Sequence, residues 1–108
     1  MAIEAMIDIA TVEMIITALT ADYKRRAEAI EKNVLPVSVI MEYKYYNTKI
    51  YNAVAEIVGE SQATSYIEDI GGRRGYSKRP DLYLSENMYY KKKNECKRNI
   101  ARALKLID

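Results

Sequence analysis

Apolar residues recur at steps of three and four along most of the chain, which is typical of α-helices. The first such run extends from about Thr11 to Lys32, and Pro36 lies beyond its end. Its start is open between Thr11 as N-cap and a point nearer Ile3. Its apolar stripe consists of Val12, Ile15, Ile16, Leu19, Tyr23, Ala27 and Ile30. The pattern predicts one long helix that buries this stripe.

A second long run follows, with Ser38 as its expected N-cap and Gly59 as its stop. Its apolar stripe consists of Val39, Tyr43, Tyr46, Ile50, Val54, Ile57 and Val58. The two tyrosines and Ile50 are predicted to be buried against the first helix, because a tyrosine stripe at helical spacing belongs most often to a core. Tyr45 and Asn47 are predicted to point away. The two helices are expected to pair as an antiparallel hairpin.

The rest of the chain divides into a short helix, a loop and a last helix. The short helix covers 61–70, closed by two glycines that can supply the left-handed conformation favoured at a helix end. The loop covers 71–84, "GGRRGYSKRPDLYL", and is expected to be exposed. The last helix covers 85–108, with Ser85 as its N-cap. Its apolar stripe consists of Tyr89, Cys96, Ile100, Ala103, Leu104 and Ile107.

No segment shows the strict alternation that indicates a strand, so the predicted fold class is all-α. We expect a small bundle of about four helices. The two long N-terminal helices would form the hairpin, and the C-terminal part would form a helix-turn-helix-like pair. A length of 108 residues suits one domain, 1–108, in which 1–60 is an acidic helical hairpin.

Charge is distributed unevenly between the two ends of this domain. Residues 1–70 hold six Lys and Arg against eleven Asp and Glu, whereas residues 71–108 hold eleven against four. The overall charge of +2 hides this contrast. A basic end of this kind favours contact with a polyanion, while the acidic body would avoid it or contact another protein. The alternative is a solvated face with no partner.

Composition argues against several other classes of protein. All ten aromatic residues are tyrosine, and histidine, the commonest general base and metal ligand, is absent. Cys96 is the single cysteine and falls in an apolar row, so it is expected to be a core residue of a protein in a reducing cytoplasm. The apolar start of the chain is interrupted by acids, so neither a signal peptide nor a membrane span is predicted. No enzyme, cofactor or metal site is expected.

The segment "SENMYYKKKNECKR", 85–98, carries the chemistry of a DNA-recognition helix. Polar side chains in its first two turns are placed where such helices contact base edges, and the later cations suit phosphates. Asparagine can pair with adenine and lysine with guanine. The predicted DNA-binding residues are Arg73, Arg74, Lys78, Arg79, Ser85, Asn87, Tyr90, Lys91, Asn94, Lys97, Arg98 and Arg102.

The longer stretch "LSENMYYKKKNECKRNIARALKLI" resembles the recognition helix of the sigma region 4 type of helix-turn-helix. More narrowly, it is similar to phage and prophage late-transcription activators of the ArpU kind. The resemblance implies that Ser85 caps the recognition helix and that Tyr89, Cys96 and Ile100 fill core positions. It also implies that the polar residues Asn87, Tyr90, Lys91 and Asn94 face DNA.

Two features depart from that family's pattern. Lys93 stands where these helices usually carry a leucine, and the long basic loop separates 61–70 from Ser85. A helix-turn-helix has a turn of only three or four residues. Either "SKRPDLYL", 77–84, supplies a short first helix, or the unit is not a true helix-turn-helix.

Two functional hypotheses therefore stand side by side. The first is a small DNA-binding regulator whose acidic N-terminal part serves dimerisation or contacts RNA polymerase or another phage protein. The second is a structural or adaptor protein, such as a phage assembly component, that acts through oligomerisation. RNA is a further option, because exposed tyrosines can stack on single-stranded bases, although no RNA-binding motif is present.

Overall fold

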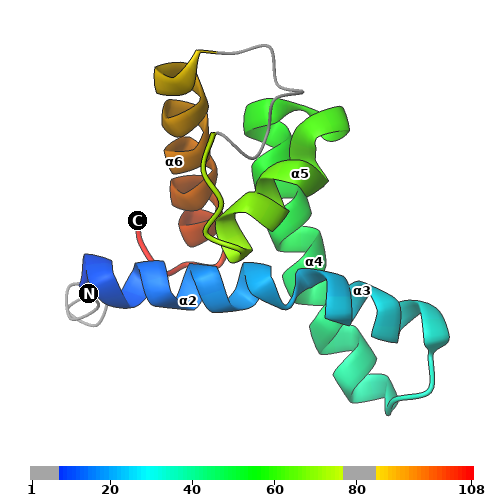
Figure 1. The fold of residues 1–108 in the computed structure, drawn as a ribbon. Helices are drawn as coiled ribbons and strands as arrows, with labels where there is room; N and C mark the ends of the chain where they lie inside the picture. The colour runs from blue at the N-terminus through cyan, green and yellow to red at the C-terminus, as the bar shows by residue number, and fades with distance from the viewer. Residues whose placement is uncertain (1–7, 77–84) are drawn as a thin grey trace.

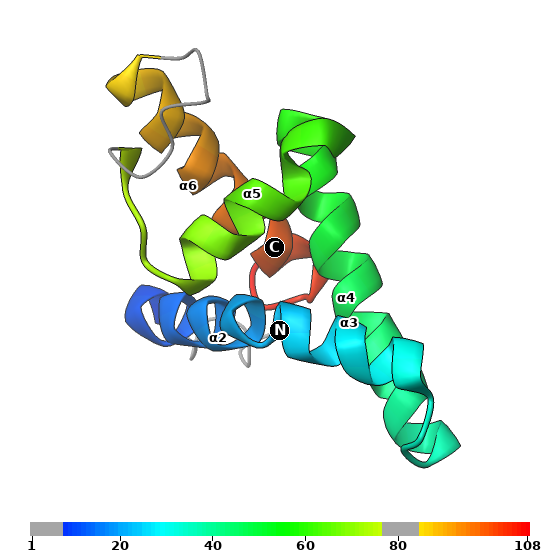
Figure 2. The same ribbon diagram turned by 45° about the vertical axis from the view of Figure 1, so that its right-hand side comes forward.

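The computed structural model describes residues 8–76 and 85–108, and these residues form helices and turns without any strand. The described helices are α2 (Ile9–Ala21), α3 (Tyr23–Lys32), α4 (Val37–Val58), α5 (Glu60–Gly71) and α6 (Glu86–Ala103). The all-α class is confirmed. Helices α2, α5 and α6 and the second half of α4 form a body, from which α3 and the first half of α4 extend (Figures 1 and 2).

The single helix predicted over 11–32 is wrong, because it is two helices that meet at Asp22. Helix α2 begins after Asp8, whose Oδ1 accepts a hydrogen bond of 2.7 Å from the Thr11 N–H. It ends at Ala21, and α3 continues from Asp22 at a bend. The apolar spacing runs through this break without interruption, so periodicity alone could not reveal it.

The predicted hairpin is consequently shorter than expected. Only α3 pairs with α4, whereas α2 packs on α5 and α6. Asn33 ends α3 in the left-handed conformation, at φ 53°, and Pro36 rather than Ser38 occupies the N-cap position of α4. We call α3, the turn 33–36 and residues 37–47 of α4 the arm.

A buried arginine joins the arm to the body. The Arg26 side chain is 3% exposed, and its Nε donates a hydrogen bond of 2.7 Å to Asn47 Oδ1. Its Nη2 donates to the Leu19 carbonyl, near the C-terminal end of α2, where a cation is favoured by the helix dipole. Asn47 in turn donates to the Tyr23 carbonyl at 3.1 Å. The prediction that Asn47 points away is therefore wrong.

The core of the body lies where α4, α5 and α6 meet above α2. Its most completely buried apolar residues are Ile16, Ile50, Val54, Ala63, Tyr66, Ile67, Ile70, Tyr89, Cys96, Ile100 and Ala101. The predicted burial of the α6 stripe is thus confirmed at Tyr89, Cys96 and Ile100. Tyr43 and Tyr46 are only half-buried, because they lie on the arm, where they contact Arg25 and Arg26.

Helix α5 approaches α2 so closely that one position admits only glycine. A Cβ on Gly71 would lie 2.5 Å from the Ala21 backbone nitrogen. Gly71 is therefore a contact residue within the helix, and Gly72 follows with φ −87°. The left-handed residue at this helix end is Arg73, at φ 55°, so the prediction that a glycine would supply that conformation is wrong.

Replacing Arg26 with methionine is expected to lower the free energy of unfolding by about 2–3 kcal/mol, since hydrogen bonds made by a charged group are lost inside the protein. Arg25→Met is the matched control. Arg25 is exposed and pairs with Asp22 at 2.6 Å on the surface, so its loss should change stability little. Urea unfolding followed by circular dichroism compares the two, and equal stabilities would contradict the role given to Arg26.

Candidate nucleic-acid interface

The start of α6 is fixed to α5 by a buried tyrosine. The Tyr89 hydroxyl donates a hydrogen bond of 2.6 Å to Asp69 Oδ2, and both residues are fully buried. The Tyr89 ring stacks on Tyr66 at 5.5 Å and meets Tyr76 edge-on at 5.6 Å. Burial, and then the Asp69 carboxylate, raise the pKa of Tyr89 well above its ordinary value. These contacts determine how α6 is rotated about its axis.

The residues that follow α5 are held along the same helix. The Lys93 ammonium donates a hydrogen bond of 2.5 Å to the Arg74 carbonyl, and the Tyr76 N–H donates to the Tyr90 hydroxyl at 3.2 Å. A Cβ on Gly75 would lie 2.5 Å from that hydroxyl, so the backbone passes close to the helix. Residues 74–76 therefore lie beside the first half of α6.

Lys93 occupies a buried position on α6 although its side chain is ionisable. It is 8% exposed, and desolvation, followed by the charge of Lys97, lowers the pKa of its ammonium group. The Arg74 carbonyl compensates for part of this desolvation. Lys93 thus holds the backbone at Arg74 beside α6, and its ammonium group is largely buried rather than presented at the surface.

The opposite side of α6 presents one continuous polar row. The exposed residues of this row are Asn87, Lys91, Asn94, Arg98 and Arg102. Their spacing of three and four keeps them on one face, over a length of about 22 Å at 1.5 Å per residue. The row holds three cations, two amides and no acid. Ser85 caps the helix as predicted, because its Oγ accepts a hydrogen bond of 3.2 Å from the Met88 N–H.

Other predicted contact residues lie outside this row. Lys97 is half-buried, and its ammonium lies 3.5 Å from Glu13 of α2. Tyr90 is 39% exposed, but its hydroxyl binds the Tyr76 backbone. Both residues therefore flank the row and also hold neighbouring segments.

The side chains of the two loop cations that the structure describes, Arg73 and Arg74, lie in different places. Arg73 lines a hollow of about 230 Å³ with Lys93 and Lys97, next to α6. Arg74 instead lines a different cavity, between α3 and α5. Lys78 and Arg79 lie outside the described residues. Within the described part of the chain, the Arg73 side chain thus lies beside α6, whereas Arg74 contacts α6 through its backbone carbonyl and extends its side chain into the other cavity.

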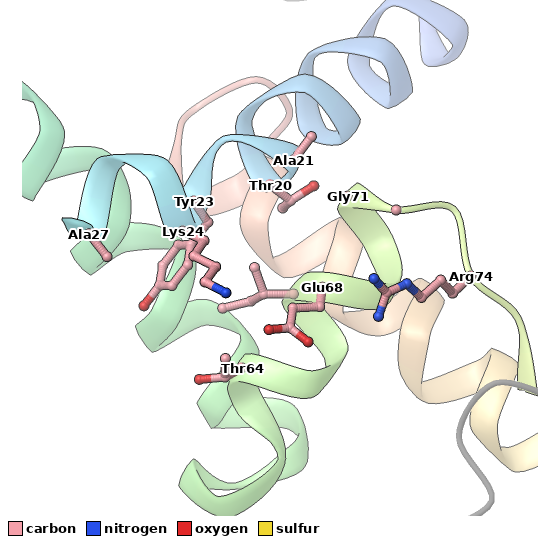
Figure 3. A pocket seen from close by; sticks show the side chains of 11 residues that line it. Thr20, Ala21, Tyr23, Lys24, Ala27, Thr64, Glu68, Gly71 and Arg74 are labelled. Carbon is pink, nitrogen blue, oxygen red and sulfur yellow. The ribbon is translucent and has the colours of Figure 1, made fainter. Parts of the chain in front are cut away.

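The cavity lined by Arg74 has a volume of about 580 Å³ and opens where α3 diverges from α5. The Glu68 carboxylate lies between Lys24 and Arg74 in the view of Figure 3. These charges form no ion pair within the described ranges, and the wall beneath them includes Tyr23 and Ile67. Lys24 and Glu68 lie on separate helices and share no motif, so their placement in one cavity could not be predicted from the sequence.

The helix-turn-helix expectation is not supported by the spacing of α5 and α6. Residues 72–85 separate the two helices, far more than a turn of three or four residues. The alternative in which 77–84 forms a short first helix lies outside the described residues.

Residues 8–76 and 85–108 contain neither a candidate metal site nor a candidate membrane-spanning helix. No cluster of three or more His, Cys, Asp or Glu side chains is placed to hold a metal ion. No helix in these ranges is both long enough and apolar enough to cross a membrane.

Comparison of the chain with models of protein families, with curated proteins and with solved structures gives no match. The surface geometry and charge of the chain therefore carry the functional argument.

Because Cys96 is buried on α6, the free energy of unfolding is expected to depend on pH in the alkaline range. Burial raises the pKa of the Cys96 thiol to about 12, whereas the unfolded thiol titrates near 9.0. Between these values the folded protein retains a proton that the unfolded chain loses, so the free energy of unfolding falls as pH rises. Urea titrations at several pH values above 9 should show a steeper fall for the wild type than for Cys96→Ala. If the free energy of unfolding fell equally with pH in both proteins, the raised pKa of Cys96 would be contradicted.

Proposed function

We propose that this protein binds duplex DNA through α6 and acts as a small transcriptional regulator of the phage or prophage kind. The observation that supports the proposal is the exposed row on α6, in which three cations and two asparagines follow one helix face without an acid. The major groove of B-DNA is wide enough to admit an α-helix.

The order of side chains along the row suits a helix that enters the groove by its N-terminal end. Asn87, Lys91 and Asn94 lie in the first half of α6 and would contact base edges. Arg98 and Arg102 lie in the second half and would contact phosphates. Arg73 beside the helix would add a further phosphate contact.

Electrostatics also support this surface over others on the molecule. Neutralising phosphates releases condensed counterions, which gives DNA affinity its strong dependence on salt. The flanking acid Glu13 is partly compensated by Lys97. The row itself therefore presents three exposed cations and no acid, with Glu95 and Glu13 beside it, and its charge suits a polyanion.

A helical adaptor or assembly protein is the second candidate function. It is favoured by the exposed apolar side chains of the arm, which include Val34 at 80% and Val37 at 75% exposure. In this alternative the arm is the working surface, and duplex DNA is not bound.

Replacing Lys91 and Arg98 together with alanine is expected to weaken binding to random-sequence duplex DNA by about tenfold or more, because two phosphate or base contacts are lost. The slope of log affinity against log salt should flatten by roughly 0.9 for each lost phosphate contact. Fluorescence anisotropy across a salt series measures both quantities.

The matched control replaces Lys24 and Lys49, two exposed lysines of α3 and α4, and so removes the same net charge. This variant should keep most of the affinity and the slope. Equal losses in the two variants would indicate a nonspecific charge effect, and no duplex binding by the wild type at low salt would refute the proposal.

A further inference from the structure

Exposed apolar side chains are concentrated on the arm. Of the nine large hydrophobic residues that are exposed within the described ranges, five lie between positions 34 and 45. They are Val34, Leu35, Val37, Met41 and Tyr45, with exposures of 80%, 38%, 75%, 65% and 49%. Scattered exposed apolar residues need no explanation, but a contiguous group on one element marks an interaction surface.

Three of these residues form a stripe on α4. Val37, Met41 and Tyr45 follow each other at steps of four, so they lie on one face over about 12 Å. The neighbouring face of α4 carries the buried Ile40 and Asn47, and Asn47 hydrogen-bonds the Tyr23 carbonyl of α3. One face of the first half of α4 is therefore buried, while the apolar stripe beside it is not covered by any part of the chain that the structure describes.

The arm has little core of its own. Ile40 is its one apolar residue that is buried, and it does not belong to the core cluster of the body. Helix α3 has ten residues, which is short for a helix that must persist on propensity alone. A partner packed on the exposed stripe would supply the missing apolar contacts.

The charges around the stripe favour one kind of partner. On α4 the exposed Glu42 lies three positions before Tyr45 and the exposed Lys44 three positions after Met41, so charges of both signs border the stripe. A polyanion or an anionic membrane would require cations alone. A surface that surrounds an apolar centre with both signs can instead match itself about a two-fold axis.

We propose that the arm is a dimer interface, in which the Val37, Met41 and Tyr45 stripe packs on the same stripe of a second copy of this chain. The two hairpins would then form a four-helix layer. The arm and α6 lie at opposite ends of the molecule in both views, so the α6 rows of the two copies would remain open (Figures 1 and 2).

The size of the patch sets the expected strength of the dimer. Five apolar residues and their charged surround are fewer than the roughly 20–30 residues per side of a standard interface. We therefore expect a dissociation constant in the micromolar range, which gives a concentration-dependent equilibrium. The inference does not rest on DNA binding and is tested without nucleic acid.

Sedimentation equilibrium from about 1 to about 100 micromolar protein brackets this range. The wild type is expected to approach twice the 12.4 kDa chain mass as concentration rises. Met41→Glu and Val37→Glu should each stay monomeric, with helical content by circular dichroism unchanged. The second substitution keeps the test decisive if the first unfolds the arm.

Met14→Glu is the matched control, because Met14 is 68% exposed on α2, in the body. It should dimerise like the wild type. A wild type that stays at 12.4 kDa throughout would overturn the proposal. Dimers that survive both arm substitutions, or that Met14→Glu abolishes, would overturn it as well.

Discussion

The hydrogen bond between the Tyr89 hydroxyl and the buried Asp69 carboxylate determines the orientation of α6, and the exposed surface follows from it. A buried carboxylate is costly unless donors compensate it, so Tyr89 cannot turn away without a large penalty. With Tyr89, Cys96 and Ile100 held inward, the row from Asn87 to Arg102 must face solvent. The functional proposal thus depends on a contact on the opposite side of the helix.

The position of the arm relative to the body depends on a second buried polar contact, made by Arg26. Arg26 binds the end of α2 through the Leu19 carbonyl and α4 through Asn47, so it fixes the bend at Asp22 and the base of the hairpin together. Desolvation lowers the pKa of this guanidinium, but the shift leaves an arginine protonated at neutral pH. Arg26 therefore joins the body and the arm at one end, while the apolar end of the arm is not covered by the described residues of the chain.

Helix positions were readable from the sequence because apolar periodicity and terminal residues are local signals. The Ser85 cap, the Gly59 stop and the burial of Tyr89, Cys96 and Ile100 were predicted correctly from such signals. The other residues of the predicted stripe, Ala103, Leu104 and Ile107, are only half-buried, and α6 ends at Ala103 rather than at 108. The break at Asp22 and the burial of Asn47 were not predicted, because they depend on Arg26, which lies 21 positions from Asn47. The α6 row could be predicted because it follows from helical spacing. The placement of the Arg73 and Arg74 side chains in different cavities could not, because it depends on how 72–76 folds over α5 and α6.

Two surfaces, one apolar and one polar, thus occupy opposite ends of one small molecule, and we propose that the polar row of α6 is the one that contacts DNA. Amide chemical shifts of 15N-labelled protein titrated with duplex DNA report which surface binds. The largest shifts are expected on α6, at Asn87, Lys91, Asn94, Arg98 and their neighbours, while the arm stays unchanged. Shifts confined to the arm or to the cavity between α3 and α5, or no shifts at low salt, would contradict the proposal.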